Sequence, residues 1–298
     1  MTEAAVAAHA KINLHLNVVS RRDDGYHDIV SLFQAVSLRD LLRLRASGVR
    51  DAVRLSGSFD VPAGENLIVR AVEAFRRETG IRGGVEIEVE KRIPLGAGFG
   101  GGSSDAAAAL RCLAALFGAE ISGETLRRLG ASLGSDVPFF LPGSGAAAVV
   151  EGRGDRITGV DPRDDYGIVA ITPARPVETA LAYDLLDARW ASRPARGLSV
   201  SEVVRMYRSN PPAQWDFINS FDEPVMAHRP DIAAVRSLLV ERGALAARLT
   251  GSGSTVIGLF GDRQEARDCA AALGAGPLCA GGARIAALDP LASLPAVW

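Results

Sequence analysis

The chain has 298 residues, of which 48% are hydrophobic and 23% charged, and 33 basic side chains nearly balance 35 acidic ones at a formal net charge of −2. This composition is typical of a globular protein, and the length suits two domains of about 150 residues each. The near-neutral charge argues against nucleic acid as a partner, because proteins that bind it usually carry a basic excess on one face. Charged residues interrupt every hydrophobic stretch before it reaches the ~18 residues of a membrane span, so we expect no membrane association.

The N-terminal residues and the cysteines predict a cytoplasmic protein. The first residues include Glu3 and no basic cluster, so they do not resemble a secretory signal. The cysteines are odd in number, widely spaced and set among alanines and leucines, which is typical of reduced core thiols: Cys112, Cys269 and Cys279. A monomer and a homodimer are both compatible with the sequence.

The first half of the chain predicts strands followed by helices. Residues 11–18 alternate polar and apolar side chains without a break, which indicates a half-buried strand, and residues 21–25 carry a turn signal. The polar side chains on one face of that strand are Lys11, Asn13, His15 and Asn17. Further strands are predicted at 29–36, 41–45, 53–55 and 85–89, and helices at 68–80 and 104–117.

The second half mixes the same two kinds of element. Strands are predicted at 167–172, 255–260 and 283–288, and helices at 180–188, 201–208, 231–242 and 262–273. Strands with one polar face, clustered ahead of helices, favour an α+β protein over a doubly wound parallel sheet. The glycine-rich stretch at 152–155 and the Pro/Asp-rich residues after it predict a boundary, so we expect domains at 1–155 and 156–298.

A glycine run between Pro94 and Asp105 is the strongest motif of the chain. Five of the seven residues at 96–102 are glycine, which leaves backbone N–H groups unshielded just before a predicted helix. Such a junction favours phosphate, because the N–H groups and the positive end of the helix dipole point at one place. Ser103 or Ser104 is expected to cap the helix and to present a hydroxyl to phosphate. The alternative is a flexible turn.

Two other phosphate-binding loops do not fit this run. Gly96, Gly98 and Gly101 match the dinucleotide pattern G-x-G-x-x-G, and Glu120 lies near the distance expected for its acidic partner. However, the strand before the run carries three glutamates, and a single helix fills the space where a second strand should end, which argues against a nicotinamide-dependent oxidoreductase. A P-loop requires a lysine after the glycines, and none follows.

Three segments resemble the GHMP kinase superfamily in order and spacing: 10–14 (AKINL), 94–107 and 249–256 (LTGSGSTV). Within it, residues 24–27 (DGYH), 100–105 (GGGSSD) and 134–140 (GSDVPFF) are similar to the kinases whose substrate is a cytidine diphosphate-linked methylerythritol. The sequence departs from the usual residues of these kinases at Phe99, at Ser254 and in the segment 219–222. The resemblance implies a two-domain α+β fold around a deep cleft, with ATP phosphorylating the 2-hydroxyl of the methylerythritol. Another small-molecule kinase of the superfamily, such as a homoserine kinase, is the alternative; a non-catalytic binding module would lack one of these motifs.

The resemblance also implies roles for residues at the reacting end of the substrate. Asp136 is expected to receive or orient the proton of the hydroxyl, and Lys11 to lie beside it and balance the developing charge. An aromatic pair is expected to hold the cytosine. The substrate-binding residues implied are Asn13, Tyr26, His27, Asp136, Thr179 and Tyr183. An ordinary core position is the alternative for Tyr183.

ATP is the implied cofactor, and Mg²⁺ follows from its chemistry, although the sequence shows no metal-ligating cluster. The resemblance implies that Glu65, Asn66 and Leu67 contact the adenine side of the nucleotide and that Lys91 lies near the nucleotide. The phosphates are implied for Pro94, Leu95, Gly96, Ala97, Gly98, Phe99, Gly100, Gly101, Gly102, Ser103 and Ser104. The chain has only two lysines, and both fall at this expected site. We expect both to lie outside the core, with Lys91 at a solvent-exposed rim.

Overall fold

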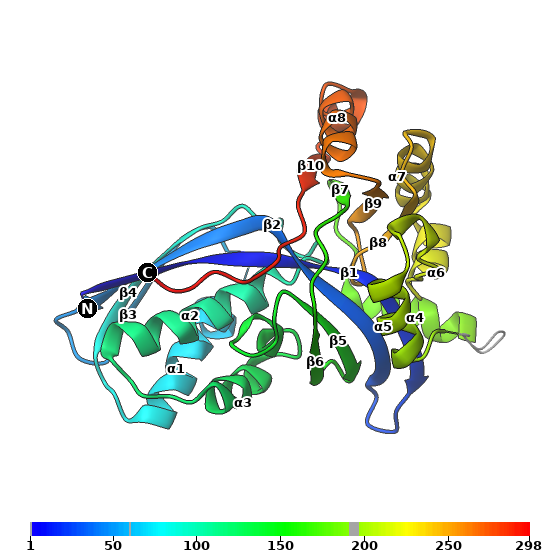
Figure 1. Ribbon diagram of the computed structural model, residues 1–298. Helices are drawn as coiled ribbons and strands as arrows, with labels where there is room; N and C mark the ends of the chain where they lie inside the picture. Colours follow the sequence, from blue (N-terminus) through cyan, green and yellow to red (C-terminus); the bar gives the residue numbers. More distant parts are fainter. Residues whose placement is uncertain (1, 60, 191–196) are drawn as a thin grey trace.

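The computed structural model describes residues 2–59, 61–190 and 197–298. Two long antiparallel strands, β1 (Glu3–Arg21) and β2 (His27–Ser47), run through the whole molecule and connect its two parts (Figure 1). The predicted α+β class is confirmed. Among the described residues, no helix is both long and apolar enough to cross a membrane.

The first part is a six-stranded sheet with helices on one face. Its strands follow the order β3-β4-β2-β5-β6, with β1 paired to β2, and only β3 and β4 run parallel. The remaining strands are β3 (Val53–Ser56), β4 (Gly84–Glu90), β5 (Ala147–Gly152) and β6 (Arg156–Val160). The helices are α1 (Leu67–Thr79), α2 (Gly101–Phe117) and α3 (Gly123–Leu133), with short 3-10 turns η1 (Ala63–Glu65) and η2 (Val137–Phe140). All three α-helices lie below the sheet in Figure 1.

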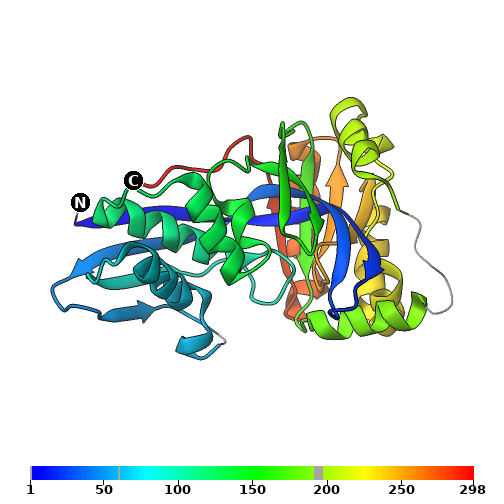
Figure 2. The same cartoon turned by 90° about the horizontal axis from the view of Figure 1, so that it is seen from below.

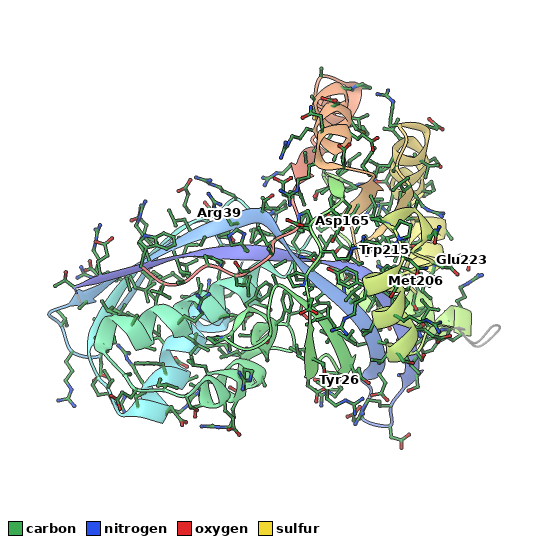
Figure 3. All side chains as sticks on the ribbon, viewed as in Figure 1. Tyr26, Arg39, Asp165, Met206, Trp215 and Glu223 are labelled. Atoms are coloured by element: carbon green, nitrogen blue, oxygen red, sulfur yellow. The ribbon has the colours of Figure 1, made fainter. Side chains whose placement is uncertain are left out.

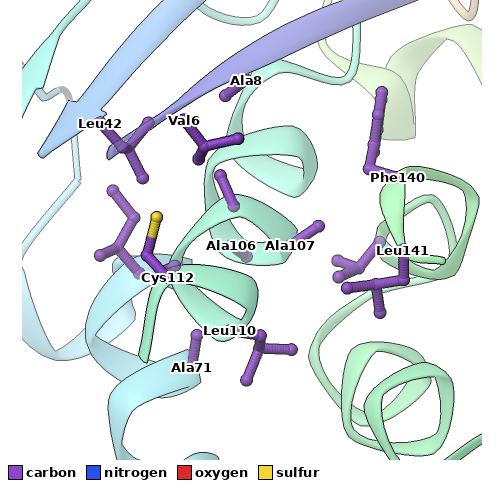
Figure 4. Close-up of a cluster of buried hydrophobic side chains, with 14 of the residues drawn as sticks. Val6, Ala8, Leu42, Ala71, Ala106, Ala107, Leu110, Cys112, Phe140 and Leu141 are labelled. Atoms are coloured by element: carbon purple, nitrogen blue, oxygen red, sulfur yellow. The ribbon is translucent and has the colours of Figure 1, made fainter. Parts of the chain in front are cut away.

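Helix α2 is the central element of this part, because its small side chains let it lie close to the sheet. Ala106 and Ala107 are fully buried, and Figure 4 shows them near Val6 and Ala8 of β1. The glycine loop therefore leads into a helix that is packed on all sides and holds a fixed position relative to β1.

The second part is a four-stranded antiparallel sheet in the order β10-β7-β9-β8. Its strands are β7 (Gly167–Thr172), β8 (Ala246–Leu249), β9 (Val256–Phe260) and β10 (Arg284–Leu288). Its helices are α4 (Thr179–Trp190), α5 (Val200–Ser209), α6 (Asp222–His228), α7 (Pro230–Glu241), α8 (Arg263–Gly274) and α9 (Pro277–Ala280), with the turn η3 (Pro212–Gln214). Figure 2 shows these elements gathered at one end of the long hairpin of β1 and β2. Figure 3 places Met206 and Trp215 in this part, and both pack with the core that joins it to the hairpin.

Three sequence-based expectations need correction here. Strand β1 is not half-buried, because its polar side chains from Lys11 to Asn17 are also buried. Phe33 and Asp136 cover Lys11, and the second part of the chain covers the polar side chains from Asn13 onward. The division at 155/156 cuts the β5–β6 hairpin, since Arg156 pairs with Glu151. Sheet pairing changes instead between Val160 and Gly167. The three thiols are free, but Cys279 is half-buried and not part of the core.

Candidate active site

The centre of the site is an ion pair between β1 and the segment after α3. The Lys11 Nζ lies 3.3 Å from Asp136 Oδ2 and donates to Asn13 Oδ1 at 2.8 Å. It also lies 4.5 Å from the centroid of the Phe33 ring. The Lys11 side chain is 5% exposed and that of Asp136 is 30% exposed. The ammonium is therefore shielded from water, while the carboxylate remains open to an incoming group.

Asp136 is held in place by the apolar residues that follow it. The turn η2 is buried along its whole length, and Phe139 packs edge-on against Phe33 at 5.4 Å. Phe139 and Phe140 contact each other in the same way at 5.0 Å. The Asp136 carboxylate thus projects from the start of a buried, well-packed turn.

The N-terminus of α2 opens beside this ion pair. Gly100 is the N-cap with φ +68°, and no side chain caps the helix. A Cβ at Gly100 would lie 3.1 Å from Lys11 Cε and 3.5 Å from Asp136 Oδ2. The free N–H groups of the helix, its positive dipole end, an ammonium and a carboxylate therefore converge on one small volume. Such an arrangement binds an anion next to a group that accepts a proton.

A second glycine loop, residues 250–254, closes the site from the other part of the chain. The Thr250 hydroxyl donates to Gly98 O at 3.3 Å, and the Gly251 N–H donates to Asn13 Oδ1 at 2.9 Å. The Asn13 amide also donates to Ser31 Oγ at 2.9 Å. Asn13 thus joins the second glycine loop to the sheet, and Thr250 joins that loop to the first. Sequence reasoning gave no role to Thr250 or Ser31, although Thr250 lies inside a motif that it recognised.

The aromatic residues expected at the substrate form two separate contacts. Tyr26 is exposed at the β1–β2 turn, where Figure 3 labels it, and the Arg153 guanidinium lies 3.6 Å from its ring centroid. His27 stacks on Tyr183 at 4.5 Å and its Nε2 lies 2.7 Å from Asp187 Oδ1. The structure does not bring the Tyr26 and Tyr183 rings into contact.

Tyr183 lies close enough to Asp136 for the two side chains to interact electrostatically. Burial raises the pKa of its hydroxyl, and the negative charge of Asp136 adds to this rise. One edge of its ring packs on Phe221 at 4.9 Å. Tyr183 lies on α4, and at the start of this helix the Thr179 hydroxyl lies 3.0 Å from Ser252 Oγ in the second glycine loop.

On the far side of the first glycine loop lies a cavity of 470 Å³. It is lined by Lys91 and Leu95 on one side and by Pro176 and Arg284 on the other. Lys91, which was expected near the nucleotide, lines this cavity, while Glu65, Asn66 and Leu67, which were expected on the adenine side, do not. The Asn66 side chain accepts from the Ile68 N–H at 2.9 Å and so caps α1.

Comparison with known proteins agrees with this geometry. Residues 66–150 match the N-terminal domain of GHMP kinases, and residues 209–277 match the GHMP kinase C-terminal domain. A 4-diphosphocytidyl-2-C-methyl-D-erythritol kinase of Thermodesulfovibrio yellowstonii is 36% identical over 265 residues, which are 87% of this chain and 90% of that protein. One of the same name from Anaeromyxobacter dehalogenans is 41% identical over 274 residues, covering 89% and 83%. The chain belongs to the 4-diphosphocytidyl-2-C-methyl-D-erythritol kinase family.

Solved structures support the same assignment. A crystal structure of 4-(cytidine 5'-diphospho)-2C-methyl-D-erythritol kinase matches with a TM-score of 0.78 at 35% identity, over 96% of this chain and all of that one. A homoserine kinase from Cytophaga hutchinsonii matches with a TM-score of 0.72 at 18% identity, over 100% of this chain and 97% of that one. At that identity the homoserine kinase shares the fold. As a member of the GHMP kinases, the chain is an ATP-dependent phosphotransferase.

Three expectations for this family member are wrong in their local detail. Lys91 does not lie at a solvent-exposed rim: its side chain is 8% exposed and its Nζ lies between Asp40 Oδ2 and Asp105 Oδ2, at 2.5 and 2.7 Å. Ser104 neither caps α2 nor presents a free hydroxyl, because it is the fourth residue of the helix and donates to His9 O at 2.7 Å. Lys11, which was also expected outside the core, is buried too, because Phe33, Gly100 and Asp136 surround its side chain.

Proposed function

We propose that the chain transfers the γ-phosphoryl group of ATP to the 2-hydroxyl of 4-diphosphocytidyl-2-C-methyl-D-erythritol. The observation that carries the proposal is the Lys11–Asp136 pair at the glycine-capped N-terminus of α2. Phosphoryl transfer requires alignment, charge neutralisation and an acceptor for the hydroxyl proton, and this volume offers all three. The substrate follows from relatives of that name at 36–41% identity.

The first part of the chain, up to Val160, binds the nucleotide in this proposal. The phosphates lie on the N–H groups at the start of α2, and the base extends toward the cavity lined by Lys91 and Leu95. Mg²⁺ enters as the complex with ATP: the part of the chain that the structure describes has no group of three side chains of the kinds that ligate metals. When bound, the ion neutralises charge on the β- and γ-phosphate oxygens.

Lys11 and Asp136 act on the hydroxyl that attacks phosphorus. Asp136 orients it and accepts its proton as the new O–P bond forms, while its partial exposure keeps the carboxylate accessible to substrate. Lys11 stabilises the alkoxide character that develops on the same oxygen. Because Asn13 holds the ammonium at 2.8 Å, the charge needs no reorganisation during the reaction.

The cytidine end lies toward His27 and Tyr183, with Tyr26 at the outer edge. His27 and Phe221 cover part of the half-buried Tyr183 ring, whereas Tyr26 is exposed, so the base stacks on Tyr26 and on the part of the Tyr183 ring that stays open. Stacking on such a surface contributes about 1–3 kcal/mol per base. We assign the reaction to the cytoplasm, where free thiols such as Cys112 stay reduced.

Phosphorylation assays with the cytidyl-linked alcohol, homoserine and mevalonate test the proposal. We expect kcat/KM for the cytidyl-linked alcohol to exceed the other two by several orders of magnitude. Asp136→Asn serves as the control, because it keeps the shape of the side chain and removes the proton acceptor. Preference for homoserine or mevalonate by the wild-type protein would overturn the substrate assignment and leave the phosphoryl-transfer site in place.

A further inference from the structure

Lys91 is held by two carboxylates beneath the first glycine loop. Its Nζ donates to Asp40 Oδ2 at 2.5 Å and to Asp105 Oδ2 at 2.7 Å. None of the three side chains is more than 8% exposed. We call Asp40, Lys91 and Asp105 the carboxylate clip.

The clip joins both ends of the glycine loop to the central strand of the sheet. Asp40, on β2, accepts through Oδ1 from the N–H groups of Arg92 and Ile93 at 2.5 and 2.8 Å, just before the loop begins. Asp105 lies in α2, just after the loop ends. Lys91 bridges the two carboxylates, so the spacing between the loop ends depends on these three side chains.

The clip carries one more negative than positive group in a region that water hardly reaches. Asp105 Oδ1 is buried and, among the described residues, has no hydrogen-bond partner. Burial raises the pKa of Asp105 to about 7; Asp40 adds to the rise and Lys91 opposes it. The charged groups that act on this carboxyl are Lys91 at the end of β4 and Asp40 on β2. At neutral pH the Asp105 carboxyl is therefore divided between its charged and neutral forms.

The clip also adjoins the space assigned above to the nucleotide. Lys91 lines the 470 Å³ cavity together with Pro94 and Leu95 of the loop. A polyphosphate on this loop brings several negative charges close to the clip, which already carries one negative charge more than positive charges. Protonation of the surplus carboxylate removes that repulsion, and Asp105 Oδ1 is the buried oxygen free to take the proton.

We propose that Asp40 and Asp105 are positioning residues for ATP, which hold the glycine loop through Lys91, and that Asp105 becomes fully protonated from solvent when the nucleotide binds. The inference rests on the proposed function for the location of the phosphates. It involves no covalent step. Its observable consequences are proton uptake on binding and a KM for ATP that rises with pH.

The direct test is calorimetry of a non-hydrolysable ATP analogue with Mg²⁺, at pH 7, in two buffers of different ionisation enthalpy. The wild-type protein is expected to take up about half a proton more per nucleotide than Asp105→Asn, since a carboxyl with a pKa of about 7 is half protonated before binding. Protonation of the nucleotide itself contributes equally to both proteins and cancels. Asp161→Asn is the matched control, because its side chain is 96% exposed and lies outside the clip; it should behave as the wild type.

Kinetics give an independent readout that a purely structural role of the clip would not change. Between pH 6.5 and 8.5 we expect the KM for ATP of the wild type to rise about three- to tenfold relative to that of Asp105→Asn, with the kcat ratio nearly constant. Should Asp105→Asn fail to fold, Asp40→Asn replaces it, because it also removes the surplus charge while its amide oxygen can still accept from the Arg92 and Ile93 N–H groups.

The outcomes separate this inference from the proposed function. If the nucleotide binds with equal proton uptake to the wild type and the clip variants, the proposed role of the clip is wrong and the proposed function is unaffected. Lack of nucleotide binding to the wild type would overturn both. A different preferred alcohol would overturn the substrate assignment and leave the proton measurement unaffected, because no alcohol is present in it.

Discussion

Gly98 is the position where the two glycine loops meet most closely, and its replacement by alanine gives a sharp test of the site. Its φ is +84°, and a Cβ there would lie 2.1 Å from the backbone oxygen of Thr250. Ordinary contact begins at 3.4 Å, so the loops must move apart by about 1.3 Å. Backbone cannot rotate away as a flexible side chain would.

Two effects of Gly98→Ala can be separated. Left-handed backbone in alanine lowers the free energy of unfolding by about 1–2 kcal/mol. The separation of the loops strains the Thr250 hydrogen bond to Gly98 and shifts the phosphate-binding N–H groups relative to Lys11 and Asp136. A displacement of about 1 Å at reacting groups lowers the rate about 10²-fold, and we expect kcat to fall by that factor.

Gly80→Ala is the matched control. Gly80 has φ +71° at the end of α1, and a Cβ there meets no atom within 4 Å. In denaturant unfolding, Gly80→Ala should lose about the same 1–2 kcal/mol of unfolding free energy that left-handed backbone costs Gly98→Ala. In an assay of ADP release it should keep the wild-type kcat. If Gly98→Ala kept more than a third of wild-type kcat, or if both variants lost activity in parallel with stability, the close approach of the loops would not organise the site.

Three further predictions concern single side chains. Lys11→Arg should lower kcat about 10²-fold and leave nucleotide affinity in calorimetry unchanged, because the longer guanidinium displaces the substrate hydroxyl from Asp136; equal kcat would exclude Lys11 from this role. Tyr183→Ala should raise KM for the cytidyl substrate about tenfold with KM for ATP constant, and a variant that only melts earlier would identify Tyr183 as a core residue. Burial raises the pKa of Asp222 to about 6, so the native state binds more protons than the unfolded state between about pH 4 and 6. The free energy of unfolding therefore falls as pH rises through this window, and denaturation of Asp222→Asn at pH 4.5 and 7 should show a smaller fall than the wild type.

The strand β1 illustrates how far local pattern carries a prediction. Its period-2 alternation correctly predicted an extended segment with Lys11 and Asn13 on one face. It wrongly predicted a half-buried strand with this face open to water, because covering residues such as Thr250 come from the other end of the chain. Alternation records which side chains share a face, and only the tertiary structure decides what lies against that face.

The elements missed by sequence reasoning have two physical causes. Helix α3 carried a usable signal: Ser122 caps its N-terminus, and Leu126, Leu129 and Leu133 recur at helical spacing. Strand β5 carried a weaker one, since its buried run of alanine and valine does not alternate, and only the turn residues that flank it at 142–145 and 152–155 favour a short strand over a helix. A continuous apolar run becomes a strand when neighbouring strands, here β2 and β6, supply its hydrogen bonds.

The two lysines of the chain share a property that their scarcity did not reveal. Both ammonium groups are buried and both contact carboxylates, Lys11 at Asp136 and Lys91 at Asp40 and Asp105. In each place several groups surround one positive charge. A compact lysine ammonium with three donors can contact them together, whereas the planar guanidinium of an arginine could not. At Lys11 the partner carboxylate remains partly open and is available to substrate. At Lys91 both carboxylates are closed off from water, and Asp40 accepts from the backbone N–H groups of Arg92 and Ile93. The same kind of ion pair therefore has two different roles. The Lys11 pair acts on the substrate, the Lys91 cluster positions the glycine loop, and the exposure of the partner carboxylate decides between these roles.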